Sequence, residues 1–203
     1  KYPIAYFRAA FGQLQTGSYN ASYMRLQAAL NYNVHINRWG KDNIRLTAGY
    51  IYTTDNKALP QSLLMAGNGY RFANSNRLQL YAFGGFITMN PFAYFHDRYA
   101  AIYYNHDFDW HLFKLKGSEP YLGVAHNILW GTLNSANAKA NPGLATAANG
   151  YHESGLIINQ LLHVNYLNLF YLNLNLAGFY HWAPTAFDWN ANGRVALGLS
   201  LSF

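Results

Sequence analysis

The chain has 203 residues, of which 51% are hydrophobic, 18% aromatic and only 11% charged; its formal net charge is +6 and it holds no cysteine. Soluble domains carry roughly twice that charged fraction, and the absence of cysteine excludes disulfides and thiolate metal sites. No run of about 18 or more apolar residues occurs, so no transmembrane helix is predicted. The positive charge is scattered rather than clustered, which argues against a nucleic-acid partner.

Segments of alternating apolar and polar residues recur along the chain, as in half-exposed β-strands. Residues 24–36 are the clearest case, because Met24, Leu26 and Ala28 share one face while Arg25 and Gln27 share the other. Asn recurs inside these segments, although it is a poor strand former; a polar barrel lumen would accommodate it. Eight strands are predicted in chain order: 4–13, 24–36, 44–53, 99–108, 121–130, 153–162, 170–182 and 195–203.

The last ten residues are the most informative, since Val195, Leu197 and Leu199 alternate with small residues and the chain closes on Phe203. Such an ending is typical of the final strand of an outer-membrane β-barrel, which the assembly machinery reads as a signal. The opening residues do not resemble a signal peptide, so we expect a mature, trimmed or partial chain. The predicted assembly signal consists of Leu197, Gly198, Leu199, Leu201 and Phe203.

The connections between the predicted strands differ greatly in length. Turn-forming residues occupy 17–20, 38–43 and 188–193, and the Ala- and Asn-rich stretch 135–150 is predicted to be a long exposed loop. The largest connection, at about 55–96, is too apolar for disorder and is expected to pack into the lumen, with 78–89 adding a short strand. Aromatic residues recur near the predicted strand ends, where interfacial girdles lie: Tyr2, Trp39, Tyr52, Tyr99, Trp110, Trp130, Tyr166, Trp182 and Trp189.

Several short motifs, taken in order, carry a resemblance to a known family. They are Lys1-Tyr2-Pro3, Met89-Asn90-Pro91-Phe92, Asp97-Arg98-Tyr99, Tyr103-Tyr104-Asn105-His106-Asp107-Phe108, His126-Asn127-Ile128-Leu129-Trp130-Gly131 and Glu153-Ser154-Gly155-Leu156-Ile157-Ile158-Asn159. The chain resembles, over nearly its whole length, the C-terminal barrel region of a Bacteroidota outer-membrane family. Full-length members of that family carry an N-terminal carboxypeptidase-regulatory-like domain, and the family is distantly similar to the BamA/TamA superfamily.

The resemblance implies that the eight strands are the C-terminal half of a sixteen-strand barrel, with 55–96 in the place of a loop that folds into the lumen. In that superfamily the loop carries an Arg-Gly motif that contacts acidic groups on the barrel wall. The nearest candidate here is Arg71, which is followed by Phe72 instead of Gly. An Arg on such a loop would gain from a bidentate carboxylate partner. The candidate latch residues between loop and barrel are Arg71, Asp97, Arg98 and Glu153.

An enzymatic reading stays open as an alternative. A lipid hydrolase of the outer membrane needs a Ser next to a His on adjacent lipid-facing strands, and Ser154, with His126 or His106, is the available combination. A protease of the Asp–His type would use Asp107 and Asp109 with His111. Without a recognised signature for either, we assign no catalytic, cofactor-binding or metal-binding residue, and interpret the histidines as interfacial or loop residues.

These observations predict an all-β protein: an antiparallel transmembrane β-barrel domain over residues 1–203, with about eight strands, either self-closed or half of a larger barrel. The expected function is that of a non-enzymatic, BamA-like integral protein of the Gram-negative outer membrane, in protein assembly or translocation, or as a scaffold. Expected partners are outer-membrane lipid and lipopolysaccharide, the assembly machinery and other proteins of a complex, without a cofactor. A passive pore and a soluble β-sandwich are the further alternatives.

Overall fold

A computed structural model describes residues 2–17, 19–71, 79–166, 169–183 and 186–202. Eight long strands form the main sheet, in which alternating side chains point to opposite faces. They are β1 (Ile4–Thr16), β2 (Tyr19–Ile36), β3 (Gly40–Thr53), β7 (Arg98–His111), β8 (Tyr121–Thr132), β9 (Tyr151–Tyr166), β10 (Phe170–His181) and β11 (Gly193–Ser202). Shorter elements lie between them: η1 (Asn37–Trp39), η2 (Thr54–Asn56), η3 (Gln61–Leu63), β4 (Met65–Ala66), β5 (Gln79–Tyr81), β6 (Phe95–His96), α1 (Ser135–Ala140) and α2 (Trp189–Asn192).

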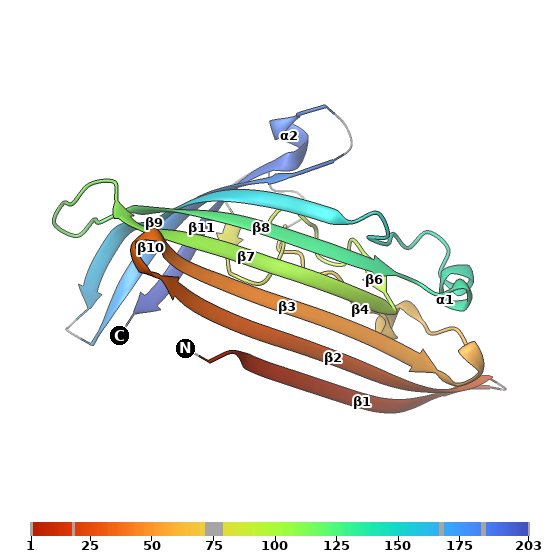
Figure 1. Cartoon of the computed structure of the whole chain (residues 1–203). Helices are drawn as coiled ribbons and strands as arrows, with labels where there is room; N and C mark the ends of the chain where they lie inside the picture. The colour runs from red at the N-terminus through yellow and green to blue at the C-terminus, as the bar shows by residue number, and fades with distance from the viewer. Residues whose placement is uncertain (1, 18, 72–78, 167–168, 184–185, 203) are drawn as a thin grey trace.

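The long strands follow one another in the sheet in chain order, each antiparallel to the next, and the sheet curls about a concave side (Figure 1). The short strand β5 extends the β11 edge by parallel pairing along Ala196–Gly198. Among the described residues, β1 pairs only with β2, so its other edge is free. The two outer long strands, β1 and β11, are therefore not joined to each other in this structure.

The two faces of the sheet differ in chemistry. On the concave face lie buried polar side chains such as Asn127, Asn173 and Asn175, together with small residues such as Ala101 and Ala196. The convex face carries large apolar side chains that remain exposed, including Leu156 at 55% and Leu199 at 62%. The core therefore lies on the concave side of the sheet.

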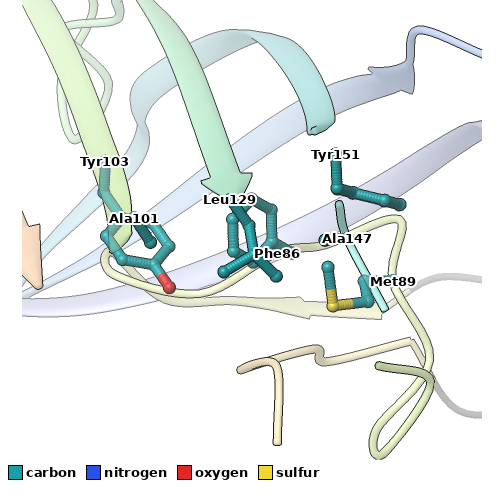
Figure 2. Packing of buried hydrophobic residues seen from close by; sticks show 7 residues of the cluster. All are labelled: Phe86, Met89, Ala101, Tyr103, Leu129, Ala147 and Tyr151. Carbon is teal, nitrogen blue, oxygen red and sulfur yellow. The ribbon is translucent and has the colours of Figure 1, made fainter. Parts of the chain in front are cut away.

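Residues 54–97, which connect β3 to β7 in the chain, are here called the inner segment; their described parts, 54–71 and 79–97, lie against the concave face (Figure 1). Phe86 and Met89 of this segment are buried against Tyr103, Leu129 and Tyr151 of the sheet (Figure 2). The Phe86 ring centroid lies 5.1 Å from that of Tyr103 and 5.4 Å from that of Tyr151, within the usual range of aromatic pairs. The long connection is thus the second layer of the core.

All eight predicted strands are confirmed, and most extend one to several residues beyond their predicted ends. The expected short strand within 78–89 is also present as β5, although its parallel pairing with β11 was not anticipated. The described part of the chain includes no helix that is long and apolar enough to cross a membrane.

Four predicted connections were wrong in part. Tyr19 and Asn20 of the predicted turn 17–20 belong to β2, and the predicted turn 188–193 contains α2 and the first residue of β11. Residues 40–43 belong to β3 instead of a turn, because Gly40, with φ of +123°, packs against the Asp107 carbonyl of β7 where a side chain would not fit. Residues 135–150 are not simply an exposed loop, since they contain α1 and bury both Asn137 and Ala147. Asn137 is bonded to Leu59 of the inner segment and Ala147 belongs to the core cluster, so this connection contributes to the buried layer of the concave side.

Candidate functional site

Glu153 of β9 anchors the inner segment to the sheet. Its side chain is fully buried on the concave face, where Oε1 accepts hydrogen bonds from the Ile87 backbone N (3.0 Å) and Asn127 Nδ2 (2.8 Å). Oε2 accepts from the backbone N and the Oγ1 of Thr88, at 2.9 and 2.6 Å. A buried carboxylate is tolerated only when donors surround it, and here four donors, three of them from the inner segment, meet that need.

A second anchor joins the inner segment to the connection that contains α1. Asp97 Oδ2 accepts hydrogen bonds from the Asn134 backbone N at 2.6 Å and from Asn137 Nδ2 at 2.9 Å. Asn137, only 1% exposed, in turn accepts a 2.7 Å hydrogen bond at Oδ1 from the Leu59 backbone N. The beginning and the end of the inner segment are therefore tied to the same buried amide.

The four predicted latch residues are not one cluster. Arg98 Nε lies 3.9 Å from Asp97 Oδ1 and donates to Thr132 Oγ1 at 2.9 Å, at an exposed position. The backbone N of Arg71 donates to the Met89 carbonyl at 2.8 Å, and within the described residues the buried Arg71 Nε has no partner. Glu153 does hold the inner segment, but its described hydrogen bonds go to Ile87, Thr88 and Asn127 and not to Arg71.

The predicted assembly signal lies on the last strand of the sheet. Leu197, Gly198 and Leu199 of β11 pair with Leu176, Asn175 and Leu174 of β10, and Leu201 pairs with Leu172. Leu199 points to the convex face and is exposed. Phe203 lies outside the described residues.

A serine–histidine pair lies on the convex face. Ser154 of β9 and His126 of β8 are directly opposite in the antiparallel register, and the distance from His126 Nδ1 to Ser154 Oγ is 2.8 Å. Trp182 Nε1 donates a second 2.8 Å hydrogen bond to the same Oγ. Because an indole N–H can only donate, Ser154 accepts from Trp182 and its own proton is free for His126. The other candidate base, His106, contacts Asp42 Oδ1 at 2.6 Å instead.

The residues considered for an Asp–His protease do not form such a pair. Asp107 accepts hydrogen bonds from the side-chain amides of Asn43, Asn105 and Asn159, at 3.3, 2.9 and 2.9 Å. Asp109 Oδ2 lies 3.1 Å from His35 Nε2, whereas His111 Nδ1 contacts the Glu119 carbonyl. The described residues hold no group of three or more His, Asp or Glu side chains arranged for a metal ion.

Several partners in these sites were not predicted. Thr88, Asn134 and Asn137 lie in connections without a periodic pattern, so nothing in the sequence marked them as hydrogen-bond partners of acidic residues. The asparagines inside strands were a usable signal, since Asn127 supplies one of the donors to Glu153. Comparison with protein-family models, with curated proteins and with solved structures finds no match to this chain.

Proposed function

We propose that this chain forms part of the wall and the lumenal loop of a BamA-like β-barrel that is integral to the outer membrane. There it assists protein assembly or translocation, or serves as a scaffold. The observation that carries the proposal is the exposed apolar convex face. Outward side chains on five of the long strands, namely Leu26, Leu46, Val124, Leu156 and Leu199, are at least 36% exposed. An apolar surface of this extent is unusual on a soluble monomer and suits contact with lipid.

The placement of charge supports the same proposal. At paired positions of the long strands, the outward-pointing charged residues are Asp42 and Arg98, and both lie close to a strand end. Arginine or lysine near the bilayer midplane of a barrel costs about 2–4 kcal/mol, and much less near the interfaces. A convex face with charge only near strand ends is the pattern expected for lipid contact.

The connections support an orientation. Residues 37–39, 112–120 and 167–169 connect strands at one end of the sheet, whereas 17–18, 54–97, 133–150 and 182–192 connect them at the other. Barrels of the outer membrane have short periplasmic turns and longer outer loops. We therefore infer that the inner segment enters the concave side from the outer surface.

The free edge of β1 supports an assembly or scaffold role over a passive pore. Along its thirteen residues, the edge of β1 that faces away from β2 offers a row of backbone donors and acceptors to another strand, and in a bilayer those groups need partners. Phe86 and Met89 of the inner segment meanwhile pack against the concave face, which reduces the room for an open channel. A soluble β-sandwich fits poorly, because the second described sheet, β4 with β6, has only two strands and lies within the inner segment.

The test is extraction of the protein from membranes in detergent, followed by gel electrophoresis with and without heating. The proposal predicts recovery from the outer-membrane fraction and a change of mobility on heating. Migration at the mass of this chain alone would mean that β1 and β11 close on each other, and migration within a larger polypeptide or complex would mean that other strands complete the barrel. Recovery in the soluble fraction would overturn the proposal.

A second candidate function, hydrolysis of a lipid ester, is favoured by the Ser154–His126 contact. In this reaction Ser154 Oγ attacks the ester carbonyl while its proton passes to His126 Nδ1. The alcohol then leaves with that proton, and water releases the acyl group with His126 again acting as base. The neighbouring outward residues Val124 and Leu156 are exposed and apolar, which suits an acyl chain.

Labelling with a fluorophosphonate probe tests this second function. Covalent labelling of the folded protein that is lost in both Ser154→Ala and His126→Ala, and kept in Ser118→Ala, would support it. Ser118, in the connection between β7 and β8, is a suitable control because its Oγ donates to the Leu161 carbonyl of β9 and, among the described residues, has no histidine partner. Absence of labelling and of ester hydrolysis in the folded wild-type protein would exclude it, leaving the pair as a means of satisfying polar groups on an apolar face.

A further inference from the structure

A polar cavity of about 230 Å³ lies between the inner segment and the sheet. Arg45 and Thr47 of β3 and Gln27 of β2 line its sheet side, and Asn68 and Gly84 line the side of the inner segment. The hydroxyl-bearing Tyr99 and Tyr103 of β7 also face it. Since one water occupies roughly 30 Å³ in the liquid, the cavity has room for a small polyatomic ion together with water.

Arg45 brings a positive charge to this cavity without a counter-ion. The chain has eight acidic side chains, all within the described residues, and none is within salt-bridge distance of Arg45. Its Nε is buried and has no hydrogen-bond partner in the described part of the chain. Arg45 as a whole is half-buried, and a buried guanidinium nitrogen without a partner is costly unless an anion or water satisfies it.

The acidic residues of the concave face are engaged elsewhere. Glu153 is surrounded by four donors, Asp97 by Asn134 and Asn137, and Asp107 by three side-chain amides. None of them is available to turn toward Arg45 without losing those bonds. No acidic side chain of the chain therefore neutralises Arg45.

The inner segment approaches the guanidinium closely at Gly84. Its φ of +93° favours glycine, and a Cβ there would lie 3.2 Å from Arg45 Cδ and 3.4 Å from one of its terminal nitrogens. Asn68 Nδ2 donates to the Gly84 carbonyl at 2.7 Å, which fixes this turn over Arg45. The site is therefore built jointly by the sheet and the inner segment.

We propose that this cavity binds a small oxyanion of the phosphate class, held by Arg45 and by the neutral donors around it. A guanidinium presents paired N–H groups that match two oxygens of a phosphate, and Thr47, Gln27 and the tyrosine hydroxyls supply further donors. Because the lining comes from both layers, the bound anion ties the inner segment to β3. The source of the phosphate group is either free inorganic phosphate or a lipid headgroup.

The test is ³¹P NMR of inorganic phosphate titrated with the folded protein in a non-phosphate detergent, repeated with short-chain phosphatidic acid. We expect saturable line broadening that weakens at least about tenfold in Arg45→Gln, as loss of a charged hydrogen-bond donor implies. Arg38→Gln is the matched control, because Arg38 is exposed in η1 and its loss changes the net charge equally. Broadening of the lipid but not of free phosphate would assign the headgroup as ligand; the reverse would assign the free ion.

Binding that is equal in Arg45→Gln and wild type, or that does not saturate with either probe, would overturn the proposal. Should Arg45→Gln fail to fold, Arg45→Lys and Gly84→Ala serve in its place. The lysine keeps the charge but loses the paired donors, and the alanine crowds the guanidinium. Both are expected to bind phosphate more weakly than wild type, and unchanged binding in both would equally contradict the site.

Discussion

Thr88 Oγ1 donates a 2.6 Å hydrogen bond to Glu153 Oε2 and so joins the inner segment to the sheet at a fully buried point. The same Oγ1 lies 2.7 Å from the Tyr151 hydroxyl. Because Thr88 has one proton and gives it to the carboxylate, Tyr151 donates to Thr88. The resulting chain of donors, Tyr151 to Thr88 to Glu153, fixes the inner segment at the centre of its contact with β9.

Glu153→Gln is therefore expected to loosen the inner segment. In the variant an amide nitrogen, which cannot accept a hydrogen bond, replaces one carboxylate oxygen and faces N–H and O–H donors. Each buried donor left without an acceptor lowers the unfolding free energy by about 1–3 kcal/mol. Limited proteolysis should cut within residues 54–97 several times faster, while the long strands stay resistant. Glu119→Gln, at an exposed connection, should leave the cleavage rate unchanged, and equal rates in all three proteins would refute the anchoring role of Glu153.

Asn137→Ala should release the second anchor. The substitution removes the hydrogen bond from the Leu59 N–H to Asn137 Oδ1 and the one from Asn137 Nδ2 to Asp97 Oδ2. We therefore expect a loss of about 1–3 kcal/mol in unfolding free energy. Hydrogen exchange should accelerate at Leu59 and around α1. The exposed Lys139→Ala in the same helix is the control, and no difference between the two variants would show that the anchor contributes nothing to stability.

Acid should destabilise the protein through His96 of the inner segment. Burial lowers the pKa of His96 to about 4 from its ordinary value of 6.5, and its ring nitrogens have no described hydrogen-bond partner. The unfolded chain takes up a proton below about pH 6.5 whereas the folded one does not until about pH 4, so stability falls as the pH drops through that interval. Denaturant titrations of His96→Leu, which cannot be protonated, should show a smaller decline over the same range; an identical decline would assign it to other groups.

Leu156→Arg should impair insertion, if the convex face meets lipid. We expect a cost of about 2–4 kcal/mol near the bilayer midplane, visible as less heat-modifiable protein in the membrane fraction. Leu115→Arg, the same change of side chain but at an exposed position on the connection between β7 and β8, should change stability by no more than about 0.5 kcal/mol. An arginine tolerated equally at both positions would speak for water on the convex face.

The alternation of residues was sufficient to predict the long strands, since a period of two fixes which side chains share a face even when the strand ends are uncertain. Residues 24–36 illustrate this, as the predicted apolar face of that segment is the convex face of β2. The inner segment could only be predicted to pack, because its shape depends on contacts distant in sequence. The bond between Thr88 and Glu153, for instance, joins residues 65 positions apart.

The candidate sites were predictable only in part, for the same reason. Glu153 was predicted as one of four candidate latch residues, but its partners depend on how a non-periodic connection folds. The pairing of Ser154 with His126 follows from the register between β8 and β9, which the sequence pattern does not determine. Arg45 was one of many alternating polar residues, and its lack of a counter-ion emerges only once the place of every acidic side chain is known.

The measurement that tests the central claim most directly is the accessibility of single spin-labelled cysteines in membranes that contain the protein. The chain has no cysteine of its own that would have to be removed first. Single cysteines for labelling are placed at Leu26, Leu156 and Leu199 on the convex face, and at Gln27 on the concave face. Our account predicts that the three convex labels collide with dissolved oxygen more than with a water-soluble nickel chelate, and that the label at Gln27 shows no such preference. Convex labels that the nickel chelate reaches freely would contradict a lipid-facing sheet.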